Sequence, residues 1–285
     1  MTAPPPRIAF YDAADGRRLA ARIFDSNATP RAHVVFLHGI SSHGGWYVRS
    51  GLYLAAAGFQ VHSLDRRGSG LNADQRGDVD RWQTWIQDVA VYLERIHREA
   101  PVVLCGISWG GKLAAAMARR HPGLIHGVAL ICPGLYSPHD PGIVRRSMLA
   151  VPVPQRIEQR QLHIPLQGPE LFTDTPAWRE YIAGDPLTLR RVTWRLARES
   201  FRLTRYAQQA APFIHMPLLL MLAGRDRIVD NRRTTAFFRR TAAVKRTLIE
   251  YPNAAHTLEF EPDPREYFND LAEWIGRTVR CDSAR

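Results

Sequence analysis

The five residues Gly-Ile-Ser-Trp-Gly at 106–110 most constrain what this chain can fold into. They follow an apolar run at residues 102–105, typical of a buried strand, and precede an alanine-rich run at residues 111–118, typical of a helix. A serine at the tip of a tight turn between a strand and a helix is a nucleophile elbow, with glycines where the two elements approach closely. This context predicts that Ser108 is a nucleophile. The alternative is a glycine-rich turn without chemistry.

A serine hydroxyl becomes a good nucleophile only when a base takes its proton and an acid orients that base. Asp226 follows an apolar run at residues 218–222, so its carboxylate is expected at the carboxyl end of a strand. His256 follows a second strand-like run and precedes the last predicted helix. Asp230 is the rival acid, but it lies farther from the strand end. Alternatively, Asp226 is a turn or helix-cap residue and His256 is a histidine of a surface loop.

An oxyanion hole is expected after another strand, at residues 33–37, which ends in a His-Gly pair. A turn of this kind allows a backbone N–H group to point toward the serine. We expect the N–H groups of Ile40 and Trp109 to bind the negatively charged oxygen that forms during acyl transfer. His38 is expected to bond within its own loop.

Outside these motifs, strands and helices alternate along the chain, which predicts a mostly parallel sheet covered by helices on both faces. The strands are expected at residues 7–11, 18–24, 34–37, 59–64, 102–107, 127–131, 218–222 and 247–250. The helices outside the elbow are expected at residues 46–57, 81–98 and 265–279.

The alternation fails between residues 135 and 212, a segment rich in proline and arginine. We predict that residues 1–134 and 213–285 form the α/β core and that the segment between them is a mainly helical cap. Ligands bind at the carboxyl ends of strands in such sheets, so a cap inserted there would lie over the serine. From their positions, Leu135, Tyr136 and Trp194 are expected to contact the substrate.

One predicted helix of the cap, at residues 186–206, separates apolar residues from arginines. At about 100° per residue the arginines fall within a narrow arc on one face. They are Arg191, Arg195, Arg198, Arg202 and Arg205. The favoured interpretation is a solvated polar face, and the alternative is a face that meets an anionic lipid surface.

Composition narrows the function classes. The net charge of +11 comes from arginine, since lysine occurs only at Lys112 and Lys245, and it favours anionic partners. No nucleic-acid-binding motif is found, so a nucleic-acid partner is not expected.

Of three cysteines, Cys105 and Cys132 fall in predicted buried strands, which favours reduced thiols over disulfides. No metal-ligand spacing, signal-peptide pattern or membrane span is recognised, so we expect no metal and a cytoplasmic location.

Together these motifs resemble the α/β-hydrolase superfamily, and within it the lysophospholipase and monoacylglycerol-lipase-like serine hydrolases. The segments that carry the resemblance are residues 38–43, Asp-Arg-Arg-Gly-Ser-Gly at 65–70, and residues 106–111, 226–230 and 255–256. The resemblance spans about residues 30–275 apart from the insert. It implies that Ser108 is the nucleophile, Asp226 the acid and His256 the base, with Ile40 and Trp109 as oxyanion donors. The 65–70 segment is expected to be a structural turn without a catalytic role. The oxyanion loop carries Ser41 and Ser42 where the best-known lipases of this group have an acidic residue.

The resemblance and the triad together predict a serine hydrolase that cleaves carboxylic esters of small molecules or lipids through an acyl-enzyme, without a cofactor. An amidase or peptidase with the same triad is the first alternative. A non-catalytic scaffold that binds an anionic ligand is the second, and the complete triad argues against it. The branches of the superfamily that act on haloalkanes and epoxides use an aspartate nucleophile, so the serine here argues against them.

Overall fold

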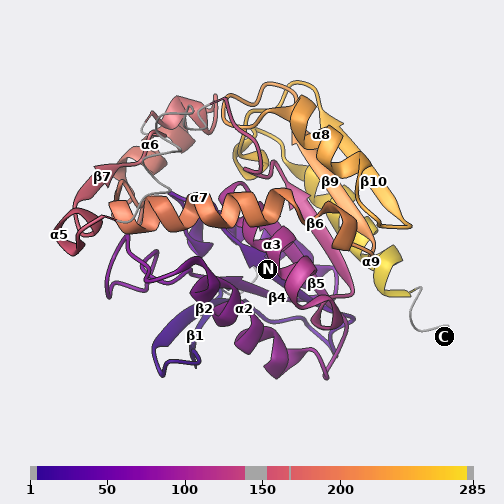
Figure 1. Cartoon of the computed structure of the whole chain (residues 1–285). Coiled ribbons are helices and arrows are strands. Elements are labelled where there is room, and N and C mark those ends of the chain that lie inside the picture. The colour runs from indigo at the N-terminus through magenta and orange to yellow at the C-terminus, as the bar shows by residue number, and fades with distance from the viewer. Residues whose placement is uncertain (1–4, 139–152, 167, 281–285) are drawn as a thin grey trace.

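An eight-stranded sheet runs through the computed structural model, which describes residues 5–138, 153–166 and 168–280 (Figure 1). The strand order is β1-β2-β4-β3-β5-β6-β9-β10. β2 pairs antiparallel with β1 and β4, and the other neighbouring strands pair in parallel. The prediction of a mostly parallel sheet is confirmed. The strands are β1 (Arg7–Asp12), β2 (Arg18–Phe24), β3 (His33–Leu37), β4 (Gln60–Leu64), β5 (Val102–Ile107), β6 (Gly127–Ile131), β9 (Leu218–Ala223) and β10 (Arg246–Tyr251).

Helices cover both faces of the sheet because side chains along each strand alternate between two apolar clusters. In β9, Leu218 and Leu220 belong to the cluster that contains residues of α2, α3, α7 and α8. Leu219 and Met221 belong to the other cluster, which contains residues of α1 and α9. These helices are α1 (Val48–Ala56), α2 (Trp82–Ile96), α3 (Trp109–Arg120), α7 (Trp194–Gln208), α8 (Asn231–Arg239) and α9 (Arg265–Arg280).

The segment between β6 and β9 holds strands as well as helices. Its other elements are α5 (Gln155–Glu158), β7 (Gln161–His163), α6 (Pro176–Gly184) and β8 (Arg191–Thr193), and β7 pairs antiparallel with β8. Short 3-10 turns complete the chain at η1 (Gly44–Tyr47), η2 (Pro122–Leu124), η3 (Pro169–Leu171), η4 (Ala211–Phe213) and η5 (Leu258–Phe260). α7 packs against α2 and α3 and is thus part of the helical layer on that face (Figure 1). The proposed cap boundaries at 135 and 212 stay a prediction, and residues 139–152 lie outside the described residues.

α7 begins later than the periodicity predicts. The helix was expected from residue 186, but residues 191–193 form β8, in which Val192 pairs with Leu162. The hydroxyl of Thr193 then accepts the N–H of Leu196 at 3.0 Å, which caps the helix at this point.

The arginines of α7 are only partly solvated. Arg198 is only 8% exposed, so the favoured prediction is wrong for this residue. Glu199 is buried beneath it and accepts hydrogen bonds from Arg198 at 3.2 Å and Arg202 at 2.8 Å. Arg195 forms an ion pair with Asp78. Arg202 and Arg205 are exposed, as the solvated face predicts. The departure is confined to the half-buried Arg195 and to Arg198, which also pairs with Glu158 at 2.6 Å.

Two expectations from composition can be compared with the structure. Cys105 and Cys132 are buried and form no disulfide, as expected, and Cys281 lies outside the described residues. Within the described ranges, no helix has both the length and the apolar character needed to span a membrane.

Candidate active site

Ser108 lies at the tight turn between β5 and α3, with φ 52° and ψ −120°. This left-handed conformation is rare for a serine and is maintained by its surroundings. A Cβ atom added to Gly110 would lie 1.9 Å from the carbonyl oxygen of Leu37, and one added to Gly106 would lie 2.6 Å from the Cβ of Ala114. The two glycines therefore allow β3, β5 and α3 to meet closely enough to form the elbow.

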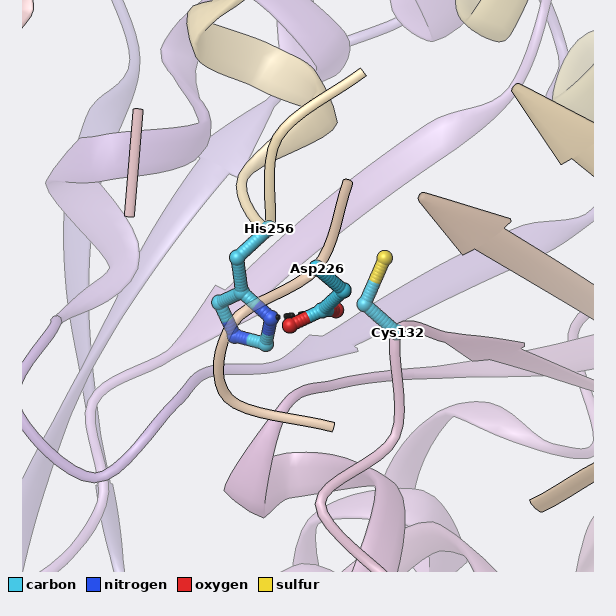
Figure 2. A group of neighbouring side chains, drawn as sticks. All are labelled: Cys132, Asp226 and His256. Atoms are coloured by element: carbon cyan, nitrogen blue, oxygen red, sulfur yellow. Dashed lines mark hydrogen bonds and ion pairs between the residues drawn. The ribbon is translucent and has the colours of Figure 1, made fainter. Parts of the chain in front are cut away.

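His256 and Asp226, the predicted base and acid, are hydrogen-bonded to each other. The Nδ1–H of His256 donates to Oδ2 of Asp226 at 2.8 Å (Figure 2). Asp226 follows β9 and His256 follows the neighbouring parallel strand β10, so their loops emerge side by side. Oδ1 of Asp226 accepts the N–H groups of Ile228 at 2.7 Å and Val229 at 2.9 Å. Burial acts to raise the pKa of Asp226, but His256 and these backbone donors outweigh it and hold the pKa below its usual value.

The second nitrogen of His256 is placed to accept a proton. Nε2 is buried and has no hydrogen-bond partner among the described residues. Because Nδ1 carries the proton that bonds Asp226, Nε2 is the acceptor of the neutral ring. The ring also contacts Phe172 of the segment between β6 and β9, with ring centres 6.1 Å apart. This nitrogen is therefore free to act as a general base, although the hydroxyl of Ser108 is not hydrogen-bonded to it in this structure.

The rival acid has a different role. The carboxylate of Asp230 accepts the N–H of Arg233 at 3.0 Å and caps α8. Its own N–H donates to the carbonyl oxygen of Tyr136 at 3.0 Å. The structure therefore pairs His256 with Asp226 and uses Asp230 to begin a helix.

Cys132 is a neighbour of this pair that the sequence placed only in the core. It directly follows β6, with φ 41°, and its sulfur lies within 4.8 Å of ligand atoms of Asp226 and His256 (Figure 2). Burial, followed by the charge of Asp226, raises the pKa of the thiol, so a thiolate is disfavoured. A metal ion here would need that thiolate and would disrupt the bond between Asp226 and His256. The arrangement therefore suits an acid–base pair better than a metal centre. The adjacency of β6 and β9 is the signal that links Cys132 to Asp226.

The oxyanion loop after β3 lies against the elbow. A Cβ atom added to Gly39 would lie 3.4 Å from the Cβ and 3.6 Å from the Oγ of Ser108. Ile40 follows, and its N–H finds no acceptor within the described part of the chain. Trp109 is the first residue of α3, where N–H groups have no partner inside the helix. The two expected oxyanion donors thus belong to segments that meet at the serine.

The three predicted substrate contacts lie in different surroundings. Leu135 and Tyr136 directly follow Gly134, whose N–H donates to the carbonyl oxygen of the elbow serine at 2.7 Å. Both side chains are buried. Trp194 begins α7, and its N–H donates to the carbonyl oxygen of Arg160 at 2.9 Å, between α5 and β7. The structure therefore brings the first two next to the elbow and places Trp194 beside the β7–β8 pair.

The segment between β6 and β9 contacts the oxyanion loop, which no pattern in the sequence predicted. The Oδ2 atom of Asp185 accepts Nε2–H of His43 at 2.9 Å and Nε1–H of Trp46 at 2.9 Å. The N–H of Leu189 donates to the carbonyl oxygen of Ser41 at 2.8 Å. No local pattern connects residues so distant in the chain. These bonds fix the loop from the side of the insert.

A family model and two named relatives match most of this chain. A family model described as serine aminopeptidase, S33, matches residues 28–263. The monoacylglycerol lipase of Mycolicibacterium smegmatis is 25% identical over 266 residues, which cover 91% of this chain and 93% of that protein. The monoglyceride lipase of Homo sapiens is 25% identical over 280 residues, which cover 95% of this chain and 91% of that protein.

Solved structures share the fold. The monoacylglycerol lipase of Paleococcus ferrophilus superposes with a TM-score of 0.81 at 24% identity, covering 92% of this chain and 98% of that one. A soluble variant of the monoglyceride lipase of Saccharomyces cerevisiae, in complex with a substrate analog, superposes with a TM-score of 0.83 at 20% identity, covering 96% and 97%. The chain therefore has the α/β-hydrolase fold and belongs to the serine aminopeptidase S33 family of serine hydrolases.

Proposed function

We propose that this protein is a serine hydrolase of carboxylic esters, a carboxylesterase of the monoacylglycerol-lipase-like type. The observation that carries the proposal is the state of His256, whose Nδ1 is bound to Asp226 while Nε2 is buried and unpaired among the described residues. Ser108 is held at the elbow at the carboxyl end of β5, the same edge of the sheet. A binding protein has no need for such a set.

The proposed reaction has two halves. Oγ of Ser108 attacks the acyl carbonyl while Nε2 of His256 takes the hydroxyl proton. The N–H groups of Ile40 and Trp109 bind the oxygen that becomes negatively charged. His256 then gives its proton to the leaving alcohol. Water, activated by the same histidine, finally cleaves the acyl-enzyme, so the chemistry requires no cofactor.

The proposed substrates are esters of lipid-like or small apolar acids. Relatives named monoacylglycerol lipase and monoglyceride lipase, which align over most of the chain, support an ester of this class. An amidase or peptidase with the same triad is the second candidate, and the description of the matching family as a serine aminopeptidase favours it. A panel of p-nitrophenyl esters of increasing acyl length, assayed beside aminoacyl anilides, separates the two. Faster turnover of the anilides would favour the peptidase.

The nucleophile is tested by substitution. A fluorophosphonate probe should label the unmodified protein, and Ser108→Ala should lose both the labelling and the ester turnover. Ser26→Ala, which changes a serine far along the chain from the elbow, is the matched control and should retain both. Full ester hydrolysis by Ser108→Ala would refute the mechanism.

Contact with an anionic lipid surface stays a prediction. Arg195, Arg198 and Arg202 give it little support, because acidic partners already occupy them. Binding to anionic vesicles at two ionic strengths is the direct test, since attraction of basic residues to such a surface weakens with salt.

A further inference from the structure

Arg66 contacts both residues that are expected to supply oxyanion donors. It lies after β4, in the Asp-Arg-Arg-Gly-Ser-Gly segment for which only a structural role was expected. Its Nη1 donates to the carbonyl oxygen of Gly39 at 3.1 Å, and its Nη2 donates to that of Ile40 at 3.0 Å. Its Cζ lies 4.5 Å from the centre of the Trp109 ring. One guanidinium group thus joins the oxyanion loop to the first residue of α3.

The bond to Gly39 acts on the peptide group that matters for catalysis. The carbonyl of Gly39 and the N–H of Ile40 belong to one planar peptide unit, in which they point in opposite directions. The Nδ1 of His38 lies 2.8 Å from the same carbonyl oxygen, and Nε2 of His38 accepts the N–H of Arg66 at 2.9 Å. Two donors on the carbonyl fix the plane of the unit and polarise it, which makes the N–H a better donor.

Among the described residues Arg66 forms no ion pair with a carboxylate, although the nearby charge of Asp65 offsets part of the effect of burial on its pKa. The side chain is 8% exposed, and the hydrogen bonds that its guanidinium makes within the described residues go to carbonyl oxygens. The neighbouring Asp65 is engaged by Arg22 at 2.8 Å. Burial lowers the pKa of Arg66 to about 9, so the group stays charged at neutral pH. Burying a cation without a direct ion-pair partner is costly, so a guanidinium kept in this place points to a use for its charge.

We propose that Arg66 is a positioning residue of the oxyanion hole, which holds the Gly39–Ile40 peptide and the Trp109 ring in place. Its positive charge strengthens the two N–H donors as negative charge forms on the substrate oxygen. This inference rests on the proposed hydrolase function. The next residue serves a different purpose, because Arg67 pairs with Asp15 and Asp88, each at 2.6 Å, away from the loop.

The test compares Arg66→Gln and Arg66→Lys with the control Arg67→Gln. For each variant, fluorophosphonate titration counts the active sites, so that incomplete folding does not count as lost catalysis. The kcat and KM for a p-nitrophenyl ester are then measured per active site, with the Ki of a trifluoromethyl ketone, which forms an oxyanion on the serine. Melting temperatures report stability separately.

We expect Arg66→Gln to lower kcat about 30- to 300-fold with little change in KM, since loss of one whole oxyanion donor costs about 10²- to 10³-fold. The Ki of the ketone should rise by a similar factor. The kcat and Ki of Arg66→Lys should lie between those of the unmodified protein and those of Arg66→Gln. Lysine keeps the charge but cannot bind two carbonyl oxygens at once, as the forked guanidinium does. Arg67→Gln should lower the melting temperature but leave kcat per site within about threefold, because its partners are not in the oxyanion loop.

Equal kcat and Ki in Arg66→Gln and the unmodified protein would overturn the proposal, and so would an equal loss of kcat in Arg67→Gln. If Arg66→Gln does not fold, Arg66→Lys decides. Parallel changes in its kcat and Ki support the role, and unchanged values overturn it. Absence of ester and anilide turnover and of probe labelling in the unmodified protein would instead refute the proposed function.

Discussion

Replacing Glu259 by glutamine should make stability less dependent on pH. Glu259 lies in η5, three residues after His256, and is 2% exposed. Its carboxylate accepts the N–H of Ser50 at 3.1 Å and the hydroxyl of the same serine, near the start of α1. Burial raises the pKa of Glu259 to about 7. The contact joins the histidine loop to the helix that follows the oxyanion loop.

The sign and size of the effect follow from the pKa of Glu259. Because the folded value of about 7 is above the reference of 4.5, this carboxyl contributes stability that is fully present below pH 4.5 and is lost as the pH rises through about 7. At about 1.4 kcal/mol for each pKa unit, the whole effect is about 3 kcal/mol of unfolding free energy. Most of it, roughly 2 to 3 kcal/mol, falls between about pH 5 and pH 8.

The assay is denaturant unfolding of the unmodified protein and of Glu259→Gln, each at about pH 5 and about pH 8. Glutamine keeps an acceptor for Ser50 but does not titrate, so the variant should gain roughly 2 to 3 kcal/mol relative to the unmodified protein on going from pH 5 to pH 8. Glu266→Gln, at an exposed position of α9, is the control and should change stability by less than about 0.5 kcal/mol. Equal losses of stability in Glu259→Gln and the unmodified protein would refute the argument that this buried carboxyl is protonated near neutrality.

The remaining predictions concern the catalytic site. Asp226→Asn should lower kcat at least about a hundredfold and Asp230→Asn far less, because Asp226 alone of the two binds the histidine; the opposite ranking would reverse the assignment. The kcat/KM of ester hydrolysis should decrease as the pH falls, since only neutral His256 accepts the serine proton, and a flat acid side of the profile would contradict this role. Gly110→Ala should lower the melting temperature strongly, because the added carbon would lie 1.9 Å from the carbonyl oxygen of Leu37; an unchanged melting temperature would show that the elbow has more room than the structure gives it.

The core elements could be predicted from the sequence because their signals are local. The three- and four-residue spacing of apolar side chains predicts a helix over residues 81–98, and α2 spans Trp82–Ile96. The pairing of Asp226 with His256 also follows from local patterns, because each residue lies in the loop that follows a predicted strand. Parallel neighbouring strands end at the same edge of a sheet, so their following loops meet.

The inserted segment could not be predicted as well, because tertiary contacts determine its structure. Periodicity alone places residues 186–193 in a helix, whereas pairing with β7 draws residues 191–193 into a strand. The same periodicity assigns Arg198 to a solvated face, whereas the buried carboxylate of Glu199 draws it inward. An acidic residue that neutralises an arginine leaves no periodic trace in the sequence.

The role of Arg66 was missed for a related reason, since a turn motif does not reveal where its side chains point. In the structure the oxyanion loop is bound through its carbonyl groups, by Arg66 at Gly39 and Ile40 and by Leu189 at Ser41. A carbonyl that is bound from behind leaves the N–H of its own peptide unit directed to the opposite side. The proposed donor of the loop, the N–H of Ile40, is therefore oriented before substrate arrives. Preorganised donors stabilise an oxyanion because they need no rearrangement during the reaction.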